Sequence, residues 1–329
     1  MPIAPDFLAA IHWQERWLEL EAVGDVDLPA YAGSTLRGAL GTVMRPELCA
    51  QPGGCGPVCA RPAECRFYAL FEQSRAGNGQ GANIPKPLIL ETPLGEPLAG
   101  IARGDAIQPP YELVPSHPLP ILRNRWRLGV PAGETLSLGL RGLGIAGAAL
   151  DGVAAGVERH GLEVKGGRLR LVGVSGGRRT LLVQGPSGGP VGGEPAARRL
   201  RLTLTTPTLI RTGNATCLDP ALLGTVVLQQ AVVRTVSLYN AFFAPRHTKL
   251  PFIEADFPRV VLTGHRLFHY QLPRQSYRQG RWMDFDGVVG WLEWEGDVAP
   301  LIPWLRAAEV LHIGQKATFG LGRVELTID

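Results

Sequence analysis

The feature that most constrains this chain is the regular pattern of its C-terminal part. Residues 199–209 alternate apolar and polar positions with the period of two expected of a half-buried strand. Asp219 and Pro220 then place a capping carboxylate before a proline at the first helical position. Residues 221–243 carry apolar residues all along, as a buried helix would. This part therefore begins with a strand followed by a long helix.

The rest of the C-terminal part completes a recognisable order of elements. Residues 259–272 and 283–295 are rich in β-branched and aromatic residues and predict a hairpin with a long polar loop. Residues 299–310 have helical periodicity with Asp297 as the cap, and residues 317–328 return to strand character. The resulting order β-α-β-β-α-β is that of a ferredoxin-like domain.

The N-terminal half shows the same rhythm less completely. The expected elements are a strand over 13–22, a helix over 34–44 capped by Ser34, a strand over 134–143, a helix over 145–160 and a strand over 168–174. Residues 45–130 hold four cysteines, many prolines and little periodicity, which predicts a Cys-rich insertion. The expected fold class is α+β, with two tandem ferredoxin-like domains over residues 1–193 and 194–329 and a Gly-rich linker between them.

Length and composition agree with two folded domains. The chain has 329 residues, which at about 100–200 residues per domain corresponds to two domains. Hydrophobic residues make up 45% and charged residues 19%, which excludes a largely disordered or fibrous protein. No apolar run approaches the about 18–20 residues of a membrane span, and polar residues interrupt the N-terminus where a signal peptide would be apolar. We therefore expect a cytoplasmic protein that does not bind a membrane.

Basic residues are concentrated in one stretch of the C-terminal part. The net charge is +4, and residues 246–281 hold seven basic side chains against two acidic ones. Within this stretch, Arg274, Tyr277, Arg278 and Arg281 form a basic loop with an interleaved aromatic ring, a composition typical of single-stranded RNA binding. A solvated hairpin tip would have the same composition, so both interpretations stay open.

The most specific segment is the glycine-rich loop, residues 311–324, which reads LHIGQKATFGLGRV. Its three glycines permit sharp bends and would leave backbone amides exposed to a phosphate. The spacing fits neither a P-loop nor a dinucleotide-binding fingerprint. The alternative is a tight helix-to-strand turn that binds nothing. The RNA-binding residues expected in this loop are Gly314, Lys316, Gly320, Gly322 and Arg323.

Several segments resemble those of a known family. Residues 311–322 are similar to the C-terminal glycine-rich signature of the CRISPR-associated endoribonucleases that process precursor repeat RNA, members of the RAMP superfamily. Residues 276–279 and 286–290 resemble the segment that precedes this signature, and residues 31–40 (YAGSTLRGAL) resemble the start of the first helix in RAMP proteins. The resemblance implies two ferredoxin-like RAMP domains, binding of CRISPR repeat RNA and cleavage without a metal.

The catalytic residues do not transfer directly from this resemblance. It implies a histidine on or near the first N-terminal helix, but residues 31–66 contain none. His312 ends the last helix, where the helix dipole favours its charged form, and it is the first choice for acid or base. Tyr31 and Arg37 are expected to contact the reacting hydroxyl and the phosphate, and His247 is a weaker choice. The alternatives are a capping histidine, a packed tyrosine and a solvated arginine.

Four of the five cysteines fall close together in the sequence: Cys49, Cys55, Cys59 and Cys65. Disulfides are uncommon in the cytoplasm, whereas four thiolates can complete a tetrahedral zinc site. An iron–sulfur cluster uses the same ligands. We expect a structural metal that stabilises the insertion and leaves no open position for chemistry. Free thiols in a Pro- and Gly-rich loop are the alternative.

Two functions follow from these residues and from the resemblance. The first is an endoribonuclease that cuts CRISPR precursor repeat RNA by attack of a 2′-hydroxyl, with no cofactor needed for catalysis, to give mature crRNA. The second is a non-catalytic RAMP-type subunit that binds crRNA beside other Cas proteins in an effector complex, which the missing first-helix histidine favours. A redox or regulatory metalloprotein is a third class, and it leaves the basic loop unexplained.

Overall fold

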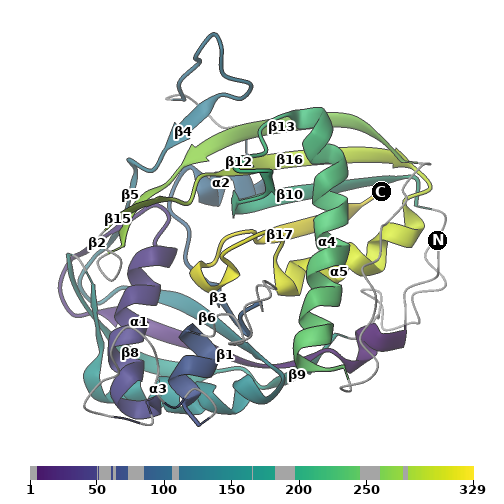
Figure 1. The fold of residues 1–329 in the computed structure, drawn as a ribbon. Coiled ribbons are helices and arrows are strands. Elements are labelled where there is room, and N and C mark those ends of the chain that lie inside the picture. Colours follow the sequence, from purple (N-terminus) through teal and green to yellow (C-terminus); the bar gives the residue numbers. More distant parts are fainter. Residues whose placement is uncertain are drawn as a thin grey trace.

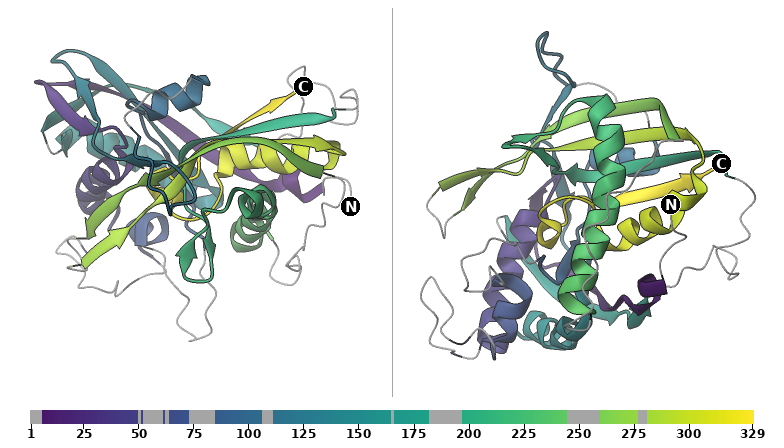
Figure 2. Two further views of the ribbon diagram at one scale, coloured as in Figure 1. Left: turned by 90° about the horizontal axis from the view of Figure 1, so that it is seen from above. Right: turned by 45° about the vertical axis from the view of Figure 1, so that its right-hand side comes forward.

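The fold combines two large β-sheets with helices packed against each of them (Figure 1). The computed structural model describes residues 6–49, 51, 61, 64–72, 85–105, 111–164, 166–181, 197–244, 260–276 and 281–329. Residues from the C-terminal part form the upper sheet in Figure 1, and residues from the N-terminal half form the lower one. The views in Figure 2 show that the two layers meet along one junction. The protein is therefore of the mixed α+β class.

The C-terminal sheet has the strand order β17-β10-β16-β13, which β4 extends. Its elements are β10 (Arg199–Thr208), α4 (Pro220–Phe242), β13 (Val260–Gln271), β16 (Gly287–Gly296), α5 (Ile302–Leu311) and β17 (Val324–Ile328). Alternating side chains such as Leu202, Leu204 and Leu292 are buried in one apolar cluster with α4 and α5. The element order expected for this part is confirmed.

α4 is the central helix of the C-terminal core. As predicted, the Asp219 carboxylate caps it by accepting hydrogen bonds from the amides of Ala221 and Leu222 at 2.8 and 3.2 Å. Among the described residues, α4 is the one helix that is long and apolar enough to span a membrane, contrary to the expectation that no apolar run reaches that length. In the fold it packs against the sheet, and Trp294 Nε1 donates to the Gly224 carbonyl at 3.1 Å. Its apolar residues therefore have a place in the core.

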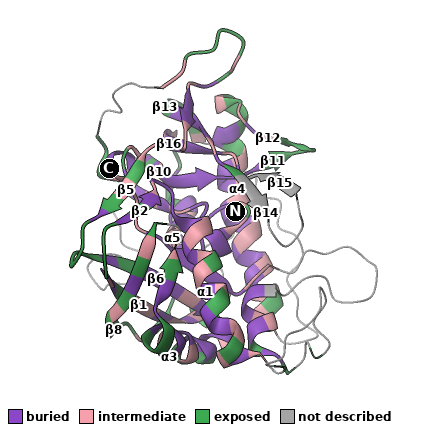
Figure 3. Cartoon of the chain, turned by 90° about the vertical axis from the view of Figure 1, so that its left-hand side faces the viewer, coloured by how far each residue is buried: buried purple, intermediate pink, exposed green. Residues whose placement is uncertain are grey.

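The N-terminal sheet has the strand order β3-β6-β1-β8-β7. Its elements are β1 (His12–Ala22), α1 (Gly33–Leu48), β3 (Leu88–Glu91), β6 (Thr135–Leu143), α3 (Leu150–His160), β7 (Leu162–Val164) and β8 (Gly167–Ser175). α1 and α3 cover one face, and the predicted inner residues of α1, Leu36, Leu40 and Val43, are buried. In Figure 3, α1 carries buried and exposed residues side by side along its length, as an amphipathic helix does.

Both predicted helix caps other than Asp219 are wrong. Ser34 lies inside α1, and the N-cap residue is Ala32, which makes no side-chain cap bond. Asp297 does not cap the last helix, because the 3-10 turn η4 (Ala299–Leu301) follows Val298 and continues directly into α5. Neither helix therefore begins with a side-chain cap.

The stretch predicted to be an insertion, residues 45–130, contributes strands to both sheets. β3 forms the edge of the N-terminal sheet by pairing with β6. β4 (Ile121–Arg123) pairs in parallel with β13 of the C-terminal sheet, and β5 (Arg127–Val130) pairs with β2 (Val26–Pro29). The described portion of this stretch is therefore part of the framework. The domain boundary at 193–194 lies outside the described residues and stays a prediction.

The sequence predicts a strand over residues 317–328, but the part of this range in the glycine-rich loop is not a strand. Residues Ala317–Phe319 form a 3-10 turn, η5, between left-handed residues at Lys316 and Gly320, and the strand begins only at Val324. Gly322 has a φ of 76°, and a Cβ on it would lie 1.8 Å from the carbonyl oxygen of Ile313. The amide of Ile313 in turn donates to the Gly322 carbonyl at 2.7 Å. The loop thus needs glycine for close backbone approach.

We predict that Gly322→Ala lowers the free energy of unfolding by roughly 4 kcal/mol or more, because the methyl group would displace a hydrogen-bonded backbone segment. Gly213→Ala is the matched control: its φ is 62°, but a Cβ there meets nothing within 4 Å. The control should lose about 1–2 kcal/mol from the left-handed conformation alone. Urea denaturation measures both values. Equal losses for the two variants would contradict the close-approach explanation.

Candidate active site

The beginning of α1 and the glycine-rich loop touch at the junction of the two sheets. Tyr31 is 1% exposed, and its hydroxyl donates a hydrogen bond to the carbonyl oxygen of Phe319 at 2.5 Å. The same oxygen lies 1.9 Å from the position of a Cβ on Gly33, so a larger residue would not fit. Burial, with a smaller effect of Tyr270, raises the pKa of Tyr31 well above its usual value. The phenol therefore stays protonated and acts as a donor.

Three cations converge beside this contact, and we call Arg37, Lys86 and Lys316 the cation cluster. The guanidinium carbon of Arg37 lies 4.6 Å from the ring centre of Phe71 and 4.2 Å from that of Phe319. Arg37 Nη2 and Lys86 Nζ both donate to the carbonyl oxygen of Phe71, at 3.0 and 2.8 Å. A shared acceptor therefore holds Lys86 next to Arg37, against their mutual repulsion.

Burial and the two neighbouring cations change the chemistry of Lys86. Lys316 enters from the glycine-rich loop, and its Nζ lies 5.6 Å from the ring centre of Phe285. Burial, together with the positive charges of Arg37 and Lys316, lowers the pKa of Lys86 to about 8. A lysine in this state exchanges its proton near neutral pH, whereas arginine stays charged. The cluster can therefore attract a phosphate and, through Lys86, transfer a proton.

Sequence reasoning identified Arg37 and Lys316 but missed Lys86. The chain contains 29 arginines and four lysines, and two of these four lysines lie in the cation cluster. That bias is a usable signal, because a lysine in an arginine-rich chain marks a position where a small or titratable cation is needed. The prolines at 85 and 87 instead suggested an irregular loop.

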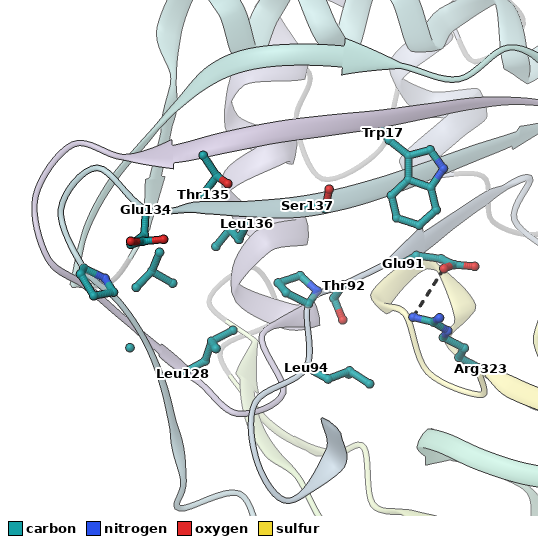
Figure 4. Close-up of a pocket in the computed structure, with 14 residues that line it drawn as sticks. Trp17, Glu91, Thr92, Leu94, Leu128, Glu134, Thr135, Leu136, Ser137 and Arg323 are labelled. Carbon is teal, nitrogen blue, oxygen red and sulfur yellow. Dashed lines mark ion pairs between the residues drawn. The ribbon is translucent and has the colours of Figure 1, made fainter. Parts of the chain in front are cut away.

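A buried ion network lies beneath the loop and is centred on Glu91, the last residue of β3. Its carboxylate pairs with Arg141 and, at 3.5 Å, with Arg323 (Figure 4). Arg141 also donates to the carbonyl of Val310 in α5 at 3.1 Å. Burial acts to raise the pKa of Glu91, but His312, Arg141 and Arg323 outweigh it and hold that pKa at about 2. A charged carboxylate therefore connects the two sheets.

His312, the first choice for acid or base, has no exposed surface. Its Nδ1 lies 3.0 Å from the carbonyl oxygen of Leu321, and its Nε2 lies 3.9 Å from Glu91 Oε1. Burial lowers the pKa of His312 despite the opposing effect of Glu91, so the expectation that the helix end favours the charged form is wrong. Contact with RNA would require the loop to move away. Its role in proton transfer stays a prediction.

The expectation of exposed amides in the loop is wrong at two of the three glycines. Gly320 and Gly322 are buried, and their amides donate to the carbonyls of Ala317 and Pro207 at 2.8 and 3.1 Å. Gly314 is half-buried, and a Cβ on it would lie 2.5 Å from the carbonyl oxygen of Leu209, the residue that follows β10. These glycines hold the loop against its neighbours, and Lys316 between them is half-buried.

The other predicted RNA-binding residues are placed only in part. Arg274 lies in β14 (Pro273–Ser276) and Arg281 in β15 (Arg281–Asp284), which pair as an antiparallel hairpin. Tyr277, Arg278 and His247 lie outside the described residues. The roles proposed for them stay predictions.

Two of the four clustered cysteines are described. Cys49 follows α1, and its Sγ donates to the Gln51 carbonyl at 3.3 Å. Cys65 is 3% exposed and accepts a hydrogen bond from the amide of Tyr68 at 3.3 Å. Both pack in or against the same N-terminal apolar cluster. Cys55 and Cys59 lie outside the described residues, so the metal site stays a prediction.

Comparisons with known families agree with this arrangement. Residues 202–324 match the family model of the CRISPR-associated endoribonuclease Cas6, and residues 11–176 match a model named AF_1859_N, described as an N-terminal domain. The first match includes the glycine-rich loop, and the second includes α1 and the strands β1, β3, β6, β7 and β8 of the N-terminal sheet. The match over residues 202–324 thus indicates a CRISPR-associated RNA-processing protein. The C-terminal part of the chain, residues 202–324, belongs to the Cas6 family of endoribonucleases.

Solved structures similar to this chain include Thermus thermophilus Cas6 (16% identity, TM-score 0.46, covering 97% of this chain and 100% of that one). The product of a Cas6-related gene from Pyrococcus furiosus is also similar (10%, 0.43, covering 96% and 98%). A partial Cas6-RT-Cas1–Cas2 complex reaches a TM-score of 0.50 at 10% identity, covering 97% of this chain and 46% of that one. No curated protein matches the sequence. At these identities, the similarity concerns the fold alone.

We predict that Glu91→Gln lowers the free energy of unfolding by about 3 kcal/mol at pH 7, because the pKa of Glu91 lies at about 2, below its usual 4.5. A depressed carboxyl pKa stabilises the fold above pH 4.5, and this contribution disappears as the pH falls toward 2. The difference between wild type and variant should therefore shrink over that range. Chemical denaturation at several pH values measures it. Glu163→Gln, at an exposed ion pair, is the control and should change stability little.

Proposed function

We propose that the protein is an endoribonuclease that cuts CRISPR precursor repeat RNA by attack of a 2′-hydroxyl on the adjacent phosphate, without a metal. The match to the Cas6 endoribonuclease family supports the substrate and the reaction type. The observation that carries the proposed mechanism is the convergence of Arg37, Lys86 and Lys316 from three separate segments. Such a cluster supplies the positive charge that a metal ion would otherwise provide.

In the proposed mechanism, Arg37 and Lys316 bind the scissile phosphate and stabilise the charge that develops on its oxygens. As the bond from the 2′-oxygen to phosphorus forms and the bond from phosphorus to the 5′-oxygen breaks, a solvent water accepts the proton of the 2′-hydroxyl and Lys86 protonates the 5′-oxygen of the leaving nucleotide. With a pKa of about 8, it is a stronger acid than an ordinary lysine, and it is still mostly protonated at pH 7. Tyr31 does not ionise but fixes the loop through Phe319, so we assign it a positioning role. We assign proton transfer to Lys86 in place of the buried His312.

We also propose that each sheet with its two helices is a ferredoxin-like RAMP domain. In the C-terminal unit, the first, second, third and fourth strands of the β-α-β-β-α-β order are β10, β13, β16 and β17, and they lie in the order 4-1-3-2. The same order describes β8, β1, β6 and β3 in the N-terminal unit. This repeated topology supports two copies of one domain type.

The alternative function is a non-catalytic RAMP-type subunit that binds crRNA within a complex of Cas proteins. The absence of histidine from residues 31–66 and the burial of His312 favour it. The similarity in fold to a Cas6-RT-Cas1–Cas2 complex is consistent with assembly beside other Cas proteins in the cytoplasm. Under this proposal the cation cluster binds a phosphate without cleaving it.

The experiment that decides between these functions is incubation of the purified protein with CRISPR repeat RNA in excess EDTA. Cleavage to a product that ends in a cyclic phosphate would support the endoribonuclease. Binding without cleavage would support the subunit. Failure both to bind and to cleave would contradict both proposals.

Within the same assay, Lys86→Ala and Lys86→Arg should each lower the single-turnover cleavage rate by about 10²- to 10⁴-fold. Arginine keeps the charge but is too weak an acid, so binding of RNA by Lys86→Arg should be retained. For the wild type, kcat/KM should fall as the pH rises above about 8, because Lys86 loses its proton. The rate of hydroxide-promoted hydrolysis rises over the same pH range. The direction of the change therefore distinguishes cleavage by the enzyme from hydroxide-promoted hydrolysis. Full activity of Lys86→Arg would contradict the acid role.

We further propose a structural zinc site formed by Cys49, Cys55, Cys59 and Cys65, with an iron–sulfur cluster as the alternative occupant. The packing of Cys49 and Cys65 against one apolar cluster supports it. Protein purified without chelators should contain about one zinc per chain, as four thiolates complete one tetrahedral site. Elemental analysis measures this, and Cys49→Ser with Cys65→Ser should remove the metal. Metal-free protein with freely titrating thiols would disprove the site.

A further inference from the structure

A cavity of about 640 Å³ lies on the face of the N-terminal sheet near Arg323, apart from the cation cluster residues (Figure 4). Trp17 of β1 and Ser137 of β6 lie along one side, and Leu94 and Leu128 lie along the opposite wall. Arg323 lies at one end. This volume is within the range of pockets that bind small organic molecules. The lining combines apolar surface with a few polar groups.

Trp17 presents a flat ring to this cavity. It faces Gly139 across the β1–β6 pair, and a Cβ on Gly139 would lie 2.8 Å from the Trp17 ring. Glycine at that position lets the indole lie close against the sheet. The ring is only partly buried and lines the cavity. An indole held in this way offers a rigid surface for stacking.

Two polar groups in the cavity keep capacity for further hydrogen bonds. Thr92 is 4% exposed, and its Oγ1 has no hydrogen-bond partner among the described residues. Arg323 pairs with Glu91 and Glu325 at 3.5 Å each, which is longer than the about 2.7–2.9 Å of a charge-assisted hydrogen bond. The N–H groups of Arg323 are therefore not saturated by these carboxylates. A ligand with acceptor atoms would complete both groups.

The cavity borders the same loop that carries Lys316. A Cβ on Gly320 would lie 3.3 Å from Thr92 Cγ2, so the loop packs directly on the cavity wall. Arg323 belongs to the end of that loop. The carboxylates of Glu91 and Glu134 also line the cavity and would repel a phosphate. A flat, uncharged group with acceptor atoms fits this lining better than a phosphate does.

We propose that this pocket binds one unstacked nucleobase of the RNA, stacked on Trp17 with its edge toward Thr92 and Arg323. The inference rests on the proposed function in that the ligand is RNA, but it does not require cleavage. Stacking of a single base on an aromatic side chain is a common means of binding unpaired RNA. The pocket would therefore fix one nucleotide at a defined position relative to the cation cluster.

The test is a scan of abasic positions in CRISPR repeat RNA, which removes one base at a time and keeps the backbone. The RNA carries a 2′-deoxynucleotide at the mapped cut site, so that binding alone is measured by fluorescence anisotropy. For the wild type, one abasic position should weaken binding by roughly 5- to 100-fold. Ser137→Trp, which fills the pocket from the exposed face of β6, should weaken binding of the intact RNA similarly. The same abasic position should then have no further effect in this variant.

Ser137→Ala is the matched control, because it removes the hydroxyl without filling the pocket, and it should bind like the wild type. Trp17→Leu is a second variant that removes the stacking surface and should behave like Ser137→Trp. RNA binding with no base that couples to Ser137 and Trp17 would overturn the pocket while leaving the proposed function intact. Absence of any RNA binding by the wild type would instead overturn both.

Discussion

The packing of the glycine-rich loop on the beginning of α1 is the contact on which the rest of the structure depends. The carbonyl oxygen of Phe319 accepts the hydrogen bond of Tyr31 and fills the space above Gly33. Because this bond is buried, breaking it would leave polar groups unpaired, and each unpaired group would cost about 1–3 kcal/mol of folding free energy. The contact fixes the position of Arg37 on α1 relative to that of Lys316 on the loop. The cation cluster is therefore a consequence of how the two sheets are joined.

Periodicity predicts the elements that bury one face and expose the other, and it fails where both faces are buried. The ends of β10, α4 and β13 were predicted to within about two residues, because alternating apolar residues or a capping residue mark them in the sequence. All four residues of β3 are buried, so its LILE sequence has no alternation and was assigned to an insertion. The loop at 317–323 also contains apolar residues, but contacts with Pro207 and Ile313 determine its backbone.

Residue types predict chemistry only when their burial is known. His312 was selected for its imidazole, yet its surroundings lower its pKa and remove it from solvent. Lys86 was overlooked because its pKa is lowered by burial and by the charges of Arg37 and Lys316, which no local pattern brings to it. The sequence correctly indicated that the glycines of the loop matter. It predicted exposed amides, however, whereas the amides of Gly320 and Gly322 donate hydrogen bonds within the protein. Sequence reasoning thus located the loop and missed which of its atoms are available.

The short strand β3 connects the chemical features of this junction. Lys86 precedes it by two residues, Glu91 ends it, and Thr92 follows it, so one segment serves the cation cluster, the ion network and the pocket. Its position is set on one side by pairing with β6 and on the other by packing against the loop at Gly320. An extended chain rises about 3.3 Å per residue and stretches little. The spacing between the proposed base pocket and the cation cluster is therefore determined by backbone geometry, and the side chains determine only which groups each of them can bind.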